Sequence, residues 1–596
     1  MPAWEQWSFD AGHFDGFHHL QKLTIQKCPK LKKFKFCFSD LKQLTITECQ
    51  ELLDFSPEEN FPKLCELEIR QCSKLKELAY SFPSLVKLKI WECQDLTSLS
   101  KIPSAGARSE ESTSSKDKEF PLLSELDIQN CTELRELPSE FPSLHKLSIR
   151  KCKELVSLSI FPKLRDLILE ECDELVLGNE VEVKPLSSMV ICQLPKLEYP
   201  GAQLLRCLSQ LINLEISNCD NLLALSENDE LGLQALNSLE RLVIDGCPKL
   251  KKLPDLFSCF TSLKELIILG CQGVEFYPET KLPPMLKRLV IEQCKHLKSL
   301  PRSIFNSQDI ALEYLEIYGC PRLVSFSEDE LPTTLKVLSI WDCFNLEFLP
   351  VGINQKNTSL NFLRIWNCHS LKCLSEEVGL PCNLLSLSVM NCENLKPLSD
   401  WGLKELANLR NFYFGGCANL VDFNAVELPD SLSSLLLKGI PTLKSLSLGL
   451  LNLKYLDILT IRDCPVLENL APVKLPSSLS CLYISNCPLL SQRRFQAEEI
   501  SICSGNNPRL DAFLTKEGWN SVGVRFVIWN FEGTVFAVCS KNVTGGFSPE
   551  DAEAIALREG LLLAKINGIE IAIGECVVQD MNSDFNLAAV ERCDLI

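Results

Sequence analysis

Several ingredients of common protein classes are scarce in this 596-residue chain. It has six histidines and no C-x-x-C pair, so it lacks the usual ligand pattern of a zinc-binding domain. No apolar run approaches the ~18 residues of a membrane-spanning helix, and we expect no membrane partner. Basic residues are in deficit, because 60 Lys and Arg face 78 Asp and Glu. The resulting net charge of −18 argues against nucleic acid as a partner, since a phosphate backbone needs clustered Lys and Arg.

The start of the chain also lacks the basic-then-apolar pattern of a secretory signal peptide, because it reads Met-Pro-Ala-Trp-Glu-Gln-Trp. Cysteine, by contrast, is abundant at 30 residues, which in a small secreted protein would suggest a disulfide scaffold. In a reducing compartment cysteine acts instead as a small buried hydrophobe with a weak S–H donor. We therefore expect a cytoplasmic protein, with the nucleus as the alternative compartment.

What the chain does contain is one frame, L-x-x-L-x-[IVLF]-x-x-C, whose nine positions are numbered 1 to 9. The first copy runs from Leu20 to Cys28 and the last from Leu479 to Cys487, and eighteen cysteines stand at position 9. The apolar positions alternate as they do in a strand, and a C-x-x-L-x-x-[LF] run continues each copy. This is the leucine-rich-repeat signature, with one short strand per unit and a return through irregular or 3-10 structure.

Strands at the same place in every unit would pair in parallel about 4.8 Å apart, so that identical positions stack in columns. The sequence therefore predicts an α/β-class solenoid of about twenty units over residues 1–490, with a parallel sheet on its concave face and a mostly irregular or 3-10 convex side. The cysteine column is interpreted as packing, with zinc binding as the alternative. Residues 101–119 form a polar, Ser-rich loop insertion, and the units at 173–210 and near 437–446 are degenerate.

The wording Cys-Pro-Lys-Leu at Cys28 and Cys247, together with the opening heptapeptide, resembles the repeats of plant coiled-coil nucleotide-binding leucine-rich-repeat disease-resistance proteins. The resemblance covers residues 1–490. It implies a non-enzymatic protein-recognition module of plant innate immunity. Its protein partner would be a pathogen effector, a guarded host protein or other receptor domains. No G-x-x-x-x-G-K-[ST] phosphate loop is present, so we expect neither the family's nucleotide-binding switch nor any cofactor for the repeats.

With a period of two, positions 3, 5 and 7 face the concave, solvent side of the sheet. In four successive units position 7 holds a large apolar side chain, and positions 3 and 5 add more rings nearby. Large aromatic residues on an exposed face are frequent interface hot spots, although some can tuck under their neighbours. The predicted partner-binding surface consists of Tyr314, Tyr318, Trp341, Phe362, Trp366, Met390 and Tyr413.

After Cys487 the frame stops, and we expect a linker at 491–507 and a second domain at 508–596. Strands are predicted at 522–529, 534–540 and 570–573, and a helix at 549–567 that Ser548 caps with Pro at its first position. The run from Ser548 to Leu561 resembles the ribonuclease-H-like domains of plant retroelements. This domain is expected to be small, partial and of the α/β class.

The resemblance implies hydrolysis of RNA in an RNA–DNA hybrid by two Mg²⁺ ions in a carboxylate cluster. Carried over, the catalytic and metal-ligating residues are Asp511, Glu553 and Glu575. Glu575 stands where the family has Asp, and the family's last elements have no match before Ile596. Residues 509–596 also hold seven basic against thirteen acidic residues. We therefore predict a non-enzymatic protein, with a metal-dependent, nucleic-acid-binding hybrid ribonuclease as the alternative.

Overall fold

The computed structural model describes residues 19–489 with gaps between the strands, of which 100–119 is the longest. It also describes three strands at residues 6–8, 521–529 and 535–544. The predicted insertion 101–119, the linker 491–507 and most of residues 508–596 lie outside the described residues. The chain divides into two compact units, one of Met1–Leu384 with Asn391–Lys396, the other of Leu385–Met390 with Pro397–Ile596.

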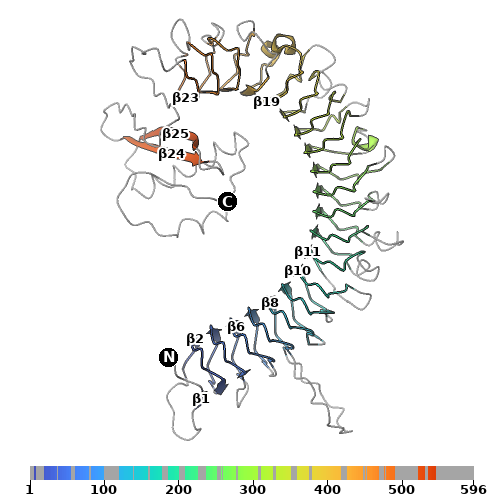
Figure 1. Ribbon diagram of the computed structural model, residues 1–596, viewed down its shortest axis with the longest axis vertical. Helices are drawn as coiled ribbons and strands as arrows, with labels where there is room; N and C mark the ends of the chain where they lie inside the picture. The colour runs from blue at the N-terminus through green and yellow to red at the C-terminus, as the bar shows by residue number, and fades with distance from the viewer. Residues whose placement is uncertain are drawn as a thin grey trace. The chain divides into compact units, whose positions relative to one another are not determined.

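In the first unit, fifteen five-residue strands form one parallel sheet along the inner side of a curved stack (Figure 1). Neighbouring strands of this sheet join like frame positions without a shift, as in Leu315↔Leu338. A short parallel sheet of β1 (Gln6–Ser8), β3 (Lys33–Lys35) and β5 (Asp54–Phe55) accompanies the first repeats. The long sheet consists of β2 (Lys22–Gln26), β4 (Gln43–Thr47), β6 (Glu66–Arg70), β7 (Lys87–Trp91), β8 (Glu125–Gln129), β9 (Lys146–Arg150), β10 (Asp166–Glu170), β11 (Ser188–Cys192), β12 (Asn213–Ser217), β13 (Arg241–Asp245), β14 (Glu265–Leu269), β15 (Arg288–Glu292), β16 (Tyr314–Tyr318), β17 (Val337–Trp341) and β18 (Phe362–Trp366).

The second unit continues the same repeat in five parallel strands and adds an antiparallel hairpin. The hairpin confirms the two strands that the sequence predicts at 522–529 and 534–540; the helix predicted at 549–567 lies outside the described residues. The parallel strands are β19 (Ser386–Met390), β20 (Asn411–Gly415), β21 (Ser434–Lys438), β22 (Ile458–Arg462) and β23 (Cys481–Ser485), and the hairpin strands are β24 (Ser521–Trp529) and β25 (Val535–Thr544).

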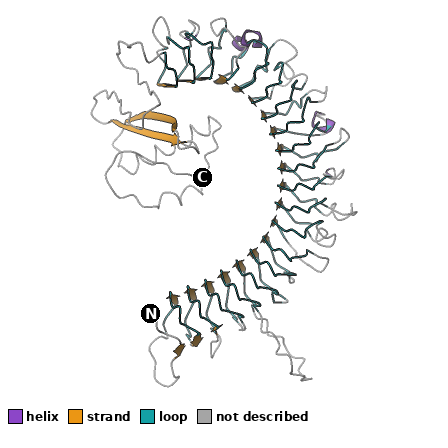
Figure 2. Cartoon of the chain, viewed as in Figure 1, coloured by secondary structure: helices purple, strands orange, loops and turns teal. Residues whose placement is uncertain are grey.

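The described returns between strands are turns, loops and short 3-10 helices, as the repeat signature predicts (Figure 2). The 3-10 helices are η2 (Arg302–Phe305), η3 (Leu398–Trp401) and η4 (Leu403–Glu405). The C-x-x-L run forms a tight turn in which the Leu N–H donates to the Cys carbonyl, at 3.1 Å for Leu31 on Cys28. Every helix in the described part of the chain is too short or too polar to cross a bilayer.

The core is built from columns of like residues, because positions 4 and 6 of each strand point away from solvent. Leu and Ile fill most places in these two columns, with Met, Val or Phe in a few, and almost all of these side chains are buried. A column of phenylalanines runs beside them in the early repeats. The rings of Phe82, Phe120, Phe141 and Phe161 stack at centroid distances of 6.0, 5.9 and 5.7 Å. Each repeat thus buries its apolar side chains against the next repeat as well as within itself.

The cysteine column packs inside, which confirms its predicted structural role. Cys172 and Cys368 are 0% exposed, and every cysteine among the described residues is a free thiol. Each of these two thiols donates weakly to the carbonyl of its own position 7 and, at 4.0 and 3.9 Å, to the position 6 carbonyl of the preceding repeat. In the two degenerate units Leu194 and Ile440 fill the same place, and β11 and β21 still pair on both sides.

Position 8, just after each strand, adopts a left-handed backbone conformation in all twenty repeats that the structure describes. This turn lets its N–H donate to the last strand carbonyl of the following repeat, at 3.0 Å for Lys27 on Thr47 and 2.8 Å for Gly319 on Trp341. Sequence reasoning missed this feature. Its signal was the composition of position 8, where twelve of the twenty residues are Asn, Asp or Gly, the types that tolerate positive φ.

Candidate functional site

Three of the predicted partner-binding residues form a continuous run of rings across β16, β17 and β18. Tyr318, Trp341 and Trp366 all occupy position 7 and are direct register partners. The Tyr318 and Trp341 ring centroids are 5.2 Å apart at 61°, and the two indoles are 4.6 Å apart at 6°. All three side chains are half-buried. Because the rings support one another, this aromatic run presents a preformed apolar wall rather than three independent side chains.

Two further predicted residues lie one row away, at position 3. Tyr314 and Phe362 are separated by Val337, which is the register partner of both. Tyr314 is 38% exposed, while Phe362 is half-buried. The structure therefore brings five of the seven predicted partner-binding residues together on one face of three adjacent strands.

A hollow of about 470 Å³ opens over β15–β18, beside the aromatic run. Positions 3 and 5 of four strands line it: Arg288, Tyr314, Glu316, Val337, Phe362 and Arg364. Sequence reasoning missed its three charged residues. The signal for them was charge at position 3 or 5 in the repeats that carry the aromatic residues, for Glu316 and Arg364, and in the repeat just before them, for Arg288.

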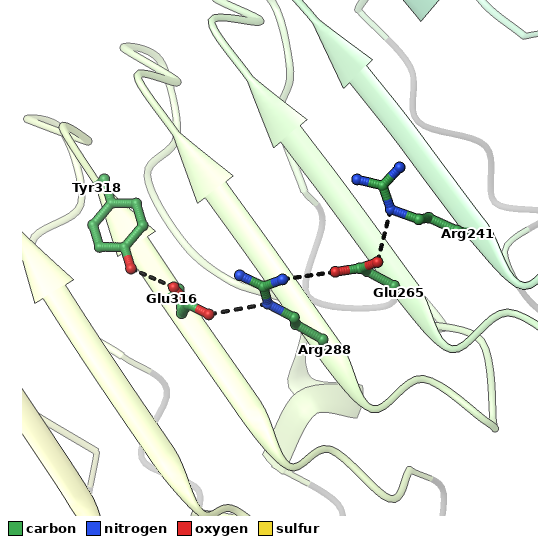
Figure 3. A network of polar contacts seen from close by, with 5 residues as sticks. All are labelled: Arg241, Glu265, Arg288, Glu316 and Tyr318. Atoms are coloured by element: carbon green, nitrogen blue, oxygen red, sulfur yellow. Dashed lines mark hydrogen bonds and ion pairs between the residues drawn. The ribbon is translucent and has the colours of Figure 1, made fainter. Parts of the chain in front are cut away.

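Charged residues of neighbouring strands form a hydrogen-bonded chain along one side of the hollow (Figure 3). Glu265 accepts from Arg241 Nε at 2.8 Å and from Arg288 Nη1 at 2.7 Å. Arg288 Nε donates at 3.1 Å to Glu316, whose other oxygen accepts from the Tyr318 hydroxyl. This hydrogen-bonded network therefore connects the hollow to the aromatic run, because Tyr318 belongs to both the network and the run.

The electrostatics of this hydrogen-bonded network keep Arg288 charged and Tyr318 neutral. Burial opposes the charge on Arg288, but Glu316 and Glu265 outweigh it and raise the pKa of the guanidinium. Burial and the hydrogen bond to Glu316 raise the pKa of the Tyr318 hydroxyl well above its usual range. Arg288 therefore stays charged and Tyr318 stays a neutral donor at physiological pH.

Met390 and Tyr413, the other two predicted partner-binding residues, do not present exposed surface. They are 8% and 7% exposed, and all five residues of β19 are buried. Both belong to the second unit. The prediction of an exposed position is wrong here because alternation along a strand says which face a side chain takes, and other groups decide whether that face is covered.

The predicted nuclease residues Asp511, Glu553 and Glu575 lie outside the described residues. Within the described part of the chain, no group of three His, Cys, Asp or Glu side chains is placed to hold a metal ion.

The early repeats present charged residues on the same face of the sheet, and many of those charges are paired. Lys87 Nζ lies 2.5 Å from Glu125 across β7 and β8, and Arg150 bridges Asp127 and Glu170 at 3.6 and 3.1 Å. Trp91 occupies position 7 here, like Trp341, but its ring lies beneath the Arg70 guanidinium at 4.0 Å. This region therefore differs from the aromatic run, in which the rings contact one another.

The repeated frame, the in-register parallel sheet and the position 8 turn together define a leucine-rich-repeat protein. No family model matches the chain. It is similar to the Arabidopsis thaliana protein named "Putative disease resistance protein At3g14460", with 27% identity over 340 residues, or 48% of this chain. The match spans 23% of that protein's length, so the chain corresponds to less than a quarter of it.

Solved structures of similar architecture come from different kinds of protein. YopM from Yersinia enterocolitica covers 77% of this chain and 86% of its own, at 18% identity and a TM-score of 0.37. The ectodomain of the Arabidopsis thaliana receptor kinase GASSHO1/SCHENGEN3, in complex with CASPARIAN STRIP INTEGRITY FACTOR 2, covers 77% and 65%, at 16% identity and a TM-score of 0.30. At these TM-scores, the class rests on the repeats and strand pairing of this chain itself.

Proposed function

We propose that the chain is a non-enzymatic protein-recognition module of plant innate immunity, and that a protein partner docks on the strand face of β15–β18. The observation that carries this proposal is the aromatic run, in which Trp341 stacks on Trp366 at 4.6 Å. Interface hot spots are enriched in Trp, Tyr and Arg, and rings already held in place lose little side-chain entropy on binding. Trp341 and Trp366 of the run, together with Tyr314, Arg288 and Arg364 of the neighbouring hollow, place all three residue types on strands β15–β18.

Similarity to a disease resistance protein supports the immune context of the proposal. The partner is accordingly a pathogen effector, a guarded host protein or another domain of a receptor. We place the protein in the cytoplasm, with repeats that work without a cofactor.

The first test removes the aromatic run. The chain is screened by two-hybrid assay against arrayed pathogen effectors, host proteins and receptor domains, and each positive pair is then measured with purified proteins by calorimetry. We expect Trp341→Ala together with Trp366→Ala to weaken binding by at least about tenfold, since truncated hot-spot residues cost about 2 kcal/mol or more.

Trp91→Ala is the matched control, because Trp91 occupies the same frame position outside the aromatic run. It removes an indole and the Arg70 contact while leaving β16–β18 unchanged. Equal affinity of the wild type and the double variant for every confirmed partner would refute the proposed docking face.

A second function concerns the C-terminal segment, where the antiparallel pair β24–β25 occurs at the two strands expected from the ribonuclease-H-like resemblance. If this segment is active, Asp511, Glu553 and Glu575 hold Mg²⁺ and cleave RNA in a hybrid. We expect no cleavage when the full chain is incubated with Mg²⁺ or Mn²⁺ and a labelled RNA–DNA duplex. Cleavage that disappears in Glu553→Gln would establish the nuclease instead.

A further inference from the structure

Four of the five arginines on the long sheet of the first unit form an ion pair with at least one carboxylate. These four are Arg70, Arg150, Arg241 and Arg288. The fifth, Arg364 of β18, has no ion pair and no hydrogen bond from its guanidinium among the described residues. Within the described part of the chain its ring contact is with Phe362, whose centroid lies 5.9 Å from Cζ.

Arg364 is unpaired although a carboxylate lies in the same hollow. Glu316 occupies the same frame position two strands away, on the far side of Ser339. Both Glu316 oxygens are already engaged, one by Arg288 and the other by Tyr318. In the hydrogen-bonded network of Figure 3 two arginines and two glutamates cancel, so no carboxylate of the described residues compensates the charge of Arg364.

A half-buried guanidinium without a counter-charge is an unfavourable arrangement in the free protein, because partial burial removes water that would otherwise solvate it. A ligand carboxylate would supply the missing charge and accept two N–H bonds at once, the geometry for which Arg is suited. The hollow has the other feature that such a ligand needs, namely an apolar wall formed by Tyr314, Val337 and Phe362.

A second unsatisfied group lies at the same place. Ser339 is 1% exposed and stands between Glu316 and Arg364 in the register of the sheet. Its hydroxyl makes no hydrogen bond in the described part of the chain. A buried hydroxyl without a partner costs roughly 1–3 kcal/mol, which a nearby acceptor oxygen would relieve. Strand alternation puts Ser339 on the same face as Arg364, so the unsatisfied hydroxyl and the unpaired guanidinium are adjacent in the register of the sheet.

We propose that the hollow binds an Asp or Glu side chain of the partner protein, flanked by an apolar residue, with its carboxylate on Arg364. This inference rests on the proposed function and names the chemistry of the segment that docks there. The carboxylate is assigned to a side chain rather than to a chain terminus, because the hollow extends across four adjacent strands, β15 to β18, and a partner segment can cross it. The apolar neighbour packs on Tyr314 and Phe362.

The probe is a phage library of random twelve-residue peptides fused through their C-termini, so that no displayed peptide offers a terminal carboxylate. The full chain is used as bait. We expect recovered peptides to be enriched in an acidic residue next to a Phe, Tyr, Leu or Ile. Synthetic versions with amidated ends are then measured against the wild type and Arg364→Gln. The variant should bind about tenfold more weakly, as expected for the loss of one charge-assisted pair.

Two matched changes isolate the contact. Changing the peptide's Asp to Asn, or Glu to Gln, should cost the same factor, and should cost nothing further against Arg364→Gln. Arg322→Gln removes an exposed arginine in the turn after β16, outside the hollow, and should leave affinity unchanged. Because Arg364 makes no ion pair among the described residues and its charge is unfavourable in the free protein, its variant should have a urea unfolding midpoint no lower than that of the wild type.

The outcomes separate the two proposals. Peptides that lose affinity in Trp341→Ala but not in Arg364→Gln would leave the docking face standing and overturn the acidic ligand. Recovered peptides without an acidic residue would likewise overturn the acidic ligand and leave the docking face standing. An equal loss of affinity in Arg322→Gln and Arg364→Gln would have the same consequence. Peptides that tolerate both Trp341→Ala and Arg364→Gln, or a bait that recovers none, would contradict both proposals.

Discussion

The buried thiol is the most repeated side chain of this protein, and burial alters its acidity. Burial raises the pKa of Cys172 to about 11 and that of Cys294 to about 12, from an ordinary value near 9.0. The neutral thiol is therefore the form that the fold accommodates, and a thiolate would be left in the apolar interior without adequate solvation. These cysteines are thus poor nucleophiles at physiological pH.

This acidity predicts how stability depends on pH. Since the folded pKa lies above the unfolded one, the unfolded chain releases the proton first, and stability that is complete below pH 9 is lost as pH rises toward 11. We expect the urea unfolding midpoint to be constant from pH 7 to 8.5 and to fall between pH 9 and 11.

The matched comparison is the double variant Cys172→Ala and Cys294→Ala, which removes two titrating groups. Its midpoint at pH 7 should be lower because packing is lost, but its decline above pH 9 should be shallower than that of the wild type. An identical decline in both proteins would show that other groups, such as Lys and Tyr, account for the alkaline loss.

Each strand ends in the position 8 turn, and the chemistry of this turn varies along the molecule. In the early repeats it holds Lys27, Glu48, Gln71 and Glu92, all at positive φ, whereas several later repeats use Gly. An L-residue in this conformation costs roughly 1–2 kcal/mol because its Cβ approaches the backbone carbonyl. The early strands therefore end in strained turns, which are held by the hydrogen bond to the next repeat.

Glu48→Gly should relieve this strain at the end of β4. The gain is expected to be up to about 1 kcal/mol in the free energy of unfolding, since the flexibility of Gly in the unfolded chain offsets part of it. Urea denaturation followed by circular dichroism measures the shift. Glu48→Ala is the control, because it removes the same carboxylate but keeps the Cβ. Equal effects of Gly and Ala would mean that charge, rather than backbone strain, is responsible.

At the level of elements, the strands were predictable from the sequence and the turns were not. Leu315, Leu338 and Leu363 predict three strands and their register together, because a one-residue slip would turn every leucine to solvent. The left-handed turns were missed because a single residue such as Lys27 or Glu48 carries no local sign of positive φ. That conformation is imposed by the pairing of two repeats and not by one of them.

At the scale of the whole molecule, some residues of the candidate site were predictable from the sequence and others were not. Tyr318, Trp341 and Trp366 were predictable because strand alternation and stacking suffice to place them side by side. Arg364 was not, since its significance depends on which carboxylates its neighbours across the sheet already engage. Tyr413 was assigned wrongly because its exposure depends on what covers the face, which no repeat encodes.

The register of the sheet also bears on how such a protein can change over generations. Every strand of the first unit's long sheet pairs with its neighbours through the same five positions, so each junction between repeats is equivalent to the others. Unequal recombination that removes or duplicates one whole repeat would rejoin surfaces that already match. The rows of side chains at positions 3, 5 and 7 could thus be lengthened, shortened or reordered without redesigning the core, and a new recognition surface could arise in a single genetic event.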